Sequence, residues 1–107
     1  MIGNIVKVIV DRPLGSHHPK YKNMIYTVNY GYVPGIIAAD GEEQDAYILG
    51  VNEPITEFTG KVIAVIHRFD DVEEKLIVVP NGAYLTKEEI IRQVDFQERF
   101  FKIEIRM

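Results

Sequence analysis

The sequence predicts a mainly β domain of the α+β class, with one helix late in the chain. Short runs rich in β-branched and aromatic residues recur up to Pro80, and Pro, Gly, Asn or Asp ends most of them. Beyond Gly82 the apolar residues follow helical spacing instead. A closed barrel is the economical arrangement for so many short strands, because closure removes exposed sheet edges. We therefore expect a single domain over residues 1–107, built as an OB-like barrel of five to six strands.

The expected strands share β-branched content and a turn signal at their ends, and they are 5–10, 25–33, 46–51, 61–69 and 75–79. Asp40-Gly41 is a turn signal between the second and third strands. Polar loops are expected at 14–23 and 52–60. An acidic turn at 70–74 joins the last two of these strands as a hairpin.

A capping box marks the start of the helix. In Thr86-Lys87-Glu88-Glu89 the Thr hydroxyl can accept from the third helical N–H while Glu89 reaches back to the cap. Apolar residues follow at helical spacing, which predicts a helix over 87–94 and a second helical turn over 95–100. Residues 102–106 alternate with a period of two and predict a final strand.

Composition excludes several classes of protein. The chain has no cysteine, so disulfide frameworks, thiolate zinc sites and cysteine nucleophiles are ruled out. Twelve basic against 16 acidic residues give a net charge of −4, which disfavours nucleic-acid binding. No apolar run approaches the roughly 20 residues that span a bilayer, and the first residues do not resemble a signal peptide. We therefore expect a cytoplasmic protein with no membrane partner.

The strongest local signal for chemistry is Asp40-Gly41-Glu42-Glu43-Gln44-Asp45. Asp40 and Glu42 point the same way in an extended backbone, and the glycine lets the chain turn sharply. Three converging oxygen ligands suit Mg²⁺ or Mn²⁺. By itself the hexapeptide also fits a solvated Asp-Gly turn. It is not an EF-hand, because the spacing of the glycine and of the final acid is wrong.

The other candidates are weaker when each is taken singly. The cluster Asp70-Asp71-Val72-Glu73-Glu74 reads as a polar hairpin turn, and Lys20 reads as a surface lysine. Tyr26 and Tyr30 fit a core face with hydroxyls at its rim. Side chains of the adjacent His17 and His18 diverge, so a metal pair is disfavoured. The sequence contains neither a phosphate-cradling glycine loop nor a nucleophile elbow.

Taken in order, these pieces resemble the soluble family I inorganic pyrophosphatases. Asn29-Tyr30-Gly31-Tyr32-Val33-Pro34, followed after a short spacer by the 40–45 hexapeptide, is similar to the family signature N-Y-G-[YF]-[IV]-P…D-G-D-P-x-D. Val8–Pro13, Pro19-Lys20-Tyr21 and Lys75–Pro80 resemble flanking family segments in the same order. The resemblance runs from about Val6 to Pro80, and it implies an OB-like barrel that binds divalent metals and pyrophosphate.

The resemblance also implies roles for individual residues. The implied metal ligands are Asp11, Asp40, Glu42, Asp45, Asp70 and either Glu73 or Glu74. Glu42 would take the place of the family's general base. The implied contacts to phosphate oxygens are Lys20, Tyr26, Tyr30, Lys75 and Lys102, of which Lys20, Tyr30 and Lys75 are also expected to assist catalysis. The implied cofactor is Mg²⁺ or Mn²⁺, the implied ligand is pyrophosphate or a related phosphorylated compound, and the implied assembly is a homo-oligomer.

Departures from the family pattern keep two alternatives open. The segment between Lys20 and Tyr26 is shorter than in the family and lacks the phosphate-binding arginine found there. The late Tyr-Lys pair of the family is represented at best by Phe101-Lys102. Loss of such donors favours a non-catalytic barrel that binds a phosphorylated ligand or a protein partner. A shortened loop also leaves room for a base, so a nucleotide phosphoanhydride hydrolase is the other alternative.

Overall fold

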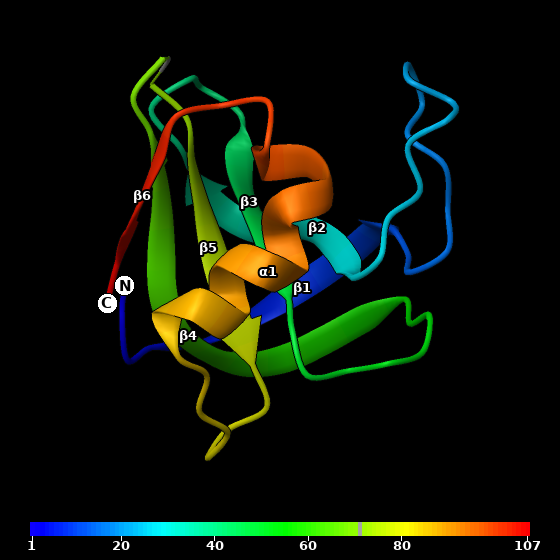
Figure 1. Ribbon diagram of the computed structural model, residues 1–107. Helices are drawn as coiled ribbons and strands as arrows, with labels where there is room; N and C mark the ends of the chain where they lie inside the picture. Colours follow the sequence, from blue (N-terminus) through cyan, green and yellow to red (C-terminus); the bar gives the residue numbers. More distant parts are fainter. Residues whose placement is uncertain (71) are drawn as a thin grey trace.

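Six strands form one sheet that closes on itself (Figure 1). The computed structural model describes residues 1–70 and 72–107. The elements in chain order are β1 (Ile5–Arg12), β2 (Asn29–Ile37), β3 (Glu43–Ile48), β4 (Glu57–Arg68), β5 (Glu74–Val79), α1 (Lys87–Glu98) and β6 (Ile103–Arg106). The strand order is β1-β2-β3-β5-β4-β6, and β1 also pairs with β4. The first five strands thus make a closed barrel and β6 extends it at β4, which confirms the predicted fold class.

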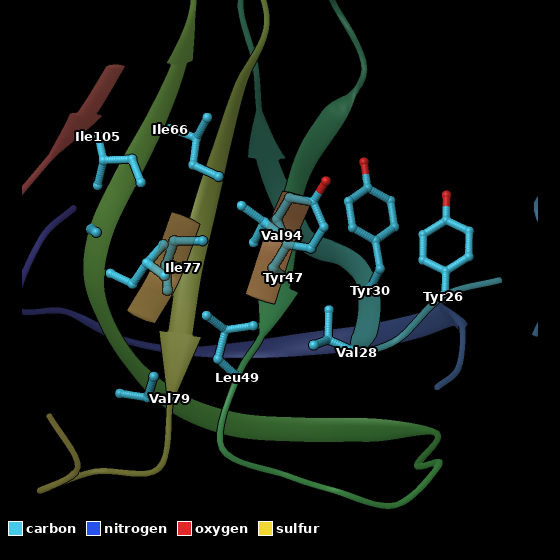
Figure 2. Close-up of a cluster of buried hydrophobic side chains, with 12 residues drawn as sticks. Tyr26, Val28, Tyr30, Tyr47, Leu49, Ile66, Ile77, Val79, Val94 and Ile105 are labelled. Atoms are coloured by element: carbon cyan, nitrogen blue, oxygen red, sulfur yellow. The ribbon is translucent and has the colours of Figure 1, made fainter. Parts of the chain in front are cut away.

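Alternate residues of the strands fill two separate apolar clusters. One cluster holds Val8, Ala46, Ile48, Leu76 and Val78 with their neighbours, and it occupies the barrel interior. The other lies between the sheet and α1, and Figure 2 shows its side chains from several strands gathered beside Val94 of the helix. Because both faces are covered over the later residues of β3 and β5, the segments 46–49 and 76–79 read as continuous apolar runs rather than as alternating ones.

The helix begins where the sequence predicts and continues further. Thr86 accepts a hydrogen bond from the Glu89 N–H at 3.1 Å, and the Glu89 carboxylate accepts from the Thr86 N–H at 3.1 Å, so the capping box is confirmed. The helix includes residues 95–98, which were expected as a separate turn. Ile90 and Val94 are buried on one face, and this face holds α1 against the outer side of the barrel (Figure 1).

Several predicted strand boundaries are wrong. The second strand does not start at Ile25 but at Asn29, because the Tyr26 N–H donates to the Ser16 carbonyl and the Tyr26 carbonyl accepts from the Gly15 N–H. This short segment therefore pairs with the preceding loop. β2 then continues through Pro34-Gly35 to Ile37, where a register shift tolerates the proline. β3 begins at Glu43, and β4 begins at Glu57 inside the expected 52–60 loop.

A β-bulge interrupts β1 at Asp11. Val10 pairs with Gly31 and Arg12 pairs with Tyr30, so Asp11 is an extra residue on its strand. The two strands approach so closely here that a Cβ on Gly31 would lie 1.8 Å from the Ile9 carbonyl oxygen, and only glycine fits. Bulges change the direction in which side chains project. This one sets the directions of Asp11 and Arg12 at the edge of the site described next.

None of the helical segments in the described part of the chain has the length and apolar character to span a membrane.

Candidate active site

A cavity of about 900 Å³, called here the large cavity, opens beside the C-terminal part of α1. The strands and the β4–β5 turn contribute mostly charged residues to its lining, whereas the 18–25 loop and the end of α1 with the residues that follow contribute most of the apolar ones. The lining residues are Asp11, Arg12, His18, Tyr21, Asn23, Met24, Ile25, Tyr30, Asp45, Arg68, Glu73, Lys75, Phe96, Gln97, Arg99, Phe100 and Phe101.

A second hollow of about 290 Å³, called here the acidic pocket, adjoins the large cavity. Apart from Tyr32 its lining residues are all acidic: Asp11, Asp40, Glu42, Glu43, Asp45 and Glu73. Asp11, Asp45 and Glu73 line both spaces. A ligand in the large cavity is therefore separated from the acidic pocket by only a row of shared carboxylates.

The hairpin between β2 and β3 carries most of the acidic pocket. The Glu42 N–H donates to the Asp40 carboxylate at 3.0 Å, and the Gly41 N–H donates to the Ala38 carbonyl at 3.0 Å. Gly41 has a φ of 85°, which a side chain would disfavour. This tight turn places Asp40 and Glu42 beside Asp45, as the sequence pattern predicts.

The acidic pocket fits a divalent cation by the chemistry of its donors. It offers carboxylate oxygens from three elements, and such ligands suit Mg²⁺ or Mn²⁺. In the conformation described for residues 1–70 and 72–107, no three acidic or histidine side chains converge on one point. Lys75 is one cause, since its ammonium contacts the Asp45 carboxylate at 2.5 Å. Asp11, Asp40, Glu42, Asp45 and Glu73 are the residues that would hold a cation here.

Lys75 is the central cation of the site. Only 3% of the residue is exposed, and its ammonium lies 3.5 Å from a Glu73 oxygen as well as beside Asp45. The ammonium is also 5.8 Å from the centroid of the Tyr30 ring. Burial of such a charge is tolerated because carboxylates compensate it. Lys75 is therefore placed between the carboxylates and the large cavity.

Tyr30 lies at the base of the large cavity with its hydroxyl parallel to those of Tyr26 and Tyr47 (Figure 2). Neighbouring ring centroids are 5.6 Å and 4.9 Å apart along this row. Burial, followed by the charge of Asp45, raises the pKa of Tyr30 well above its usual value. The phenol is therefore a protonated hydrogen-bond donor at neutral pH.

A chain of hydrogen bonds runs behind the cavity through α1. Arg12 donates to the Tyr26 hydroxyl, which donates to the Gln97 amide oxygen at 2.7 Å. The Gln97 amide nitrogen donates to the Tyr47 hydroxyl at 2.6 Å, and Tyr47 donates to the Glu98 carboxylate at 2.6 Å. Within the described residues, no buried side-chain nitrogen or oxygen lacks a partner.

Arg68 completes this chain at the other end. Its Nε and Nη2 donate to the two oxygens of Glu98 at 2.9 and 2.7 Å, and its Nη1 donates to Glu73 at 2.8 Å. Burial lowers the pKa of Arg68, but the hydrogen bonds and charge of Glu98 outweigh it and leave the pKa raised. Glu98 is almost fully buried, and Arg68 links it to the wall of the cavity.

The structure brings together seven of the residues that the sequence predicts for the site: Asp11, Tyr30, Asp40, Glu42, Asp45, Glu73 and Lys75. Glu73 rather than Glu74 faces the site, because Glu74 pairs with His67 at 3.2 Å and with Arg106 at 3.5 Å.

The structure does not place the other four predicted residues in either space. Lys20 is exposed and lies over the Tyr21 ring, and Lys102 is exposed beyond α1. The Asp70 carboxylate accepts a hydrogen bond from the Lys102 N–H at 3.2 Å and lines neither space. Tyr26 has no exposed surface. Asp71, which the sequence places in the same acidic turn, lies outside the described residues.

The two adjacent histidines organise their loop. The His17 ring nitrogen contacts the Lys22 carbonyl at 2.7 Å, and the His18 Nδ1 accepts from the N–H groups of Lys20 and Tyr21. Burial, then the charges of Arg12 and Lys20, lowers the pKa of His18, which therefore stays neutral as an acceptor. The two rings thus contact different backbone groups of the same loop.

The cavity contains three arginines that sequence reasoning missed, namely Arg12, Arg68 and Arg99. A signal for Arg68 exists in the sequence, because it has the same strand parity as the buried Ala64 and Ile66. Glu98 similarly continues the helical spacing of Ile90 and Val94. A charged residue on each of two facing apolar stripes predicts a buried ion pair.

An acidic pocket beside a cavity with buried basic side chains has the donors that suit a divalent cation and a polyanion side by side. Comparison with known proteins specifies the class of protein. The family model described as "Inorganic pyrophosphatase" matches residues 6–105. The chain belongs to the inorganic pyrophosphatase family, as the motifs predicted.

Individual relatives agree with the family assignment. The inorganic pyrophosphatase of Neisseria meningitidis serogroup A is 28% identical over 130 residues, which cover 94% of this chain and 73% of that protein. The solved inorganic pyrophosphatase of Ehrlichia chaffeensis has a TM-score of 0.72 at 18% identity, covering 97% of this chain and 85% of that chain. That of Neisseria gonorrhoeae has a TM-score of 0.69 at 22% identity, with 88% and 72% covered.

Proposed function

We propose that this protein hydrolyses inorganic pyrophosphate to two phosphates with Mg²⁺ or Mn²⁺. The observation that carries the proposal is the row formed by Asp11, Asp45 and Glu73, which lines both the acidic pocket and the large cavity. Pyrophosphate hydrolysis needs anion binding and charge neutralisation side by side. Membership of the inorganic pyrophosphatase family supports the reaction.

The divalent cation would supply charge neutralisation and activation of the attacking water. Asp11, Asp40, Glu42, Asp45 and Glu73 would hold it from the hairpin and the strand ends. Glu42 would accept the proton of that water as the general base. Hydrolysis adds the water oxygen to one phosphorus and releases the other phosphate, which takes up a proton.

Lys75 and Tyr30 would bind the phosphate oxygens from the opposite side. Their burial strengthens such contacts, because hydrogen bonds from a positioned donor in a water-poor site cost little reorganisation. Lys20 and Lys102 do not line the cavity, so they are left out of this assignment. Tyr26 has no exposed surface, so it is left without a contact to the substrate as well.

Phosphate release from pyrophosphate, tripolyphosphate and nucleoside triphosphates tests the proposal, with Mg²⁺ and Mn²⁺ over pH 7–9. We expect pyrophosphate to be the best substrate. Glu42→Ala should reduce the rate about 10²- to 10⁴-fold, because a general base contributes about that much. Glu53→Gln, on an exposed loop, is the matched control. If wild type releases phosphate no faster than Glu42→Ala from every substrate, the result would favour the non-catalytic binding barrel instead.

Cytoplasmic location is a further proposal that rests on the composition and the first residues of the sequence, and assembly into a homo-oligomer is one that rests on the family resemblance. Light scattering of the purified protein measures the assembly state directly.

A further inference from the structure

Arg12 lies at the end of β1, directly after the bulge at Asp11. A regular strand would send adjacent side chains to opposite faces. Here both Asp11 and Arg12 line the large cavity, which is the kind of redirection that a bulge produces. The arginine therefore reaches the cavity from a strand position that ordinary alternation would direct elsewhere.

Arg12 differs from the other cations on the cavity wall in its partners. Arg68 pairs with Glu98 and Glu73, Lys75 pairs with Asp45 and Glu73, and Arg99 pairs with Asp95. Among the described residues Arg12 forms no ion pair. Its hydrogen bond goes to a neutral phenol and uses Nη1, although a guanidinium carries five N–H donors. The charge of the neighbouring Asp11 acts on this guanidinium without forming an ion pair, and several of its donors remain available to a ligand.

Two tyrosines hold this guanidinium in place. Its carbon lies 5.6 Å from the centroid of the Tyr26 ring and 5.5 Å from that of Tyr30. The Tyr26 hydroxyl that accepts from Nη1 is itself fixed, because it donates to Gln97 on α1. An arginine held in this way loses less side-chain freedom when it binds a ligand.

The position of Arg12 relative to Lys75 suits an anion with two phosphate groups. Both cationic groups lie beside the same Tyr30 ring, the Lys75 ammonium at 5.8 Å from its centroid. Arginine binds phosphate through two parallel N–H···O contacts, whereas lysine acts as a point charge. We propose that Arg12 binds a phosphate group of the substrate, an inference that rests on the proposed pyrophosphatase activity and adds a substrate-binding residue to it.

Steady-state kinetics with pyrophosphate and calorimetry with imidodiphosphate, a non-hydrolysable analogue, test this role. Arg12→Met should raise KM and weaken analogue binding about 10- to 100-fold, as expected for loss of a charge-assisted contact. Arg12→Lys should recover part of the affinity, because it restores the charge without the paired donors. Arg92→Met, on the exposed side of α1, is the matched control and should behave as wild type.

The variant Tyr26→Phe tests whether Tyr26 positions Arg12 for binding or only supports the fold. Removing the hydroxyl should weaken analogue binding a few-fold in the wild-type background and have no further effect in the Arg12→Met background, since the tyrosine acts through the arginine. Equal losses in the two backgrounds would contradict this coupling. If Arg12→Met does not fold by circular dichroism, Arg12→Lys and Tyr26→Phe decide the question.

The outcomes distinguish the two proposals. If wild type hydrolyses pyrophosphate and Arg12→Met retains its KM and analogue affinity, the role of Arg12 is wrong and the activity stands. If wild type is inactive but binds the analogue through Arg12, the activity is wrong and the binding role stands. A wild type that neither hydrolyses pyrophosphate nor binds the analogue overturns both.

Discussion

Replacing Glu98 with glutamine should be among the most damaging single changes to the stability of this protein. The Glu98 side chain is 1% exposed and that of Arg68 is 6% exposed. Glu98 accepts two hydrogen bonds from Arg68 and one from Tyr47. Glu98→Gln keeps the shape but leaves a buried guanidinium facing an amide.

The expected loss follows from this burial. Breaking a buried ion pair on one side costs about 3–5 kcal/mol, since the remaining charge is uncompensated. Arg68 keeps Glu73 at 2.8 Å, so we expect about 3 kcal/mol, the lower end of that range. With an m-value of about 1–3 kcal/mol/M, the urea midpoint should fall by roughly 1 M or more.

Equilibrium urea unfolding, followed by circular dichroism, measures this loss. Glu53→Gln is the control for an exposed glutamate and should change stability by less than about 0.5 kcal/mol. The double variant Arg68→Met/Glu98→Gln should be more stable than Glu98→Gln alone, because it also removes the buried charge that Glu98 no longer compensates. A loss below about 1 kcal/mol for Glu98→Gln would refute the argument that Arg68 depends on this carboxylate.

Two further predictions concern the site and its tyrosines. Mg²⁺ at a hundred times its Kd should stabilise wild type by about 2.7 kcal/mol, and the variant Asp45→Asn should lose that gain. Thermal melts of wild type that do not respond to Mg²⁺ would contradict the assignment of the acidic pocket as the cation site. Burial raises the pKa of Tyr30 and Tyr47, so the stability they contribute is complete below about pH 10 and lost as the pH rises further, because the unfolded chain ionises first. Tyrosinate absorbance of these two should appear together with unfolding, and its appearance in a still folded protein would be inconsistent with their burial.

Strand content was predictable because the barrel is covered on both faces. β3 and β5 carry unbroken apolar runs whose alternate residues fill the barrel interior and the layer under α1. The capping box at Thr86 likewise specified the helix start from local contacts alone. In both cases the structure depends on features within the segment itself, either its run of apolar residues or its local hydrogen bonds.

The start of β2 was not predictable in the same way. Residues 25–28 have strand composition, yet Tyr26 pairs through its backbone with Gly15 and Ser16. The start of β4 has few apolar residues, and it is a strand because Phe58 pairs with Val8 far earlier in the chain. Pairing over such a separation leaves no local signal in the sequence.

The acidic half of the site was predictable, whereas its basic half was only partly so. Asp40, Glu42 and Asp45 follow one another around a single hairpin, so their spacing already implies proximity. Arg12 reaches the cavity because of a bulge that depends on the partner strand. Lys20 shows the converse, since a residue that matches a motif by order lies outside both spaces.

The pairing of β1 with β4 has a consequence for synthesis of the chain. β5 lies between β3 and β4 in the sheet, so the barrel cannot close before residue 79 has been made. The residues of α1 that line the large cavity are synthesised later still. Long-range pairing of this kind slows folding, because the entropy of closing long loops is lost before the contacts form. A nascent chain that stops short of α1 would expose the apolar faces of β3 and β5 and would have no binding cavity.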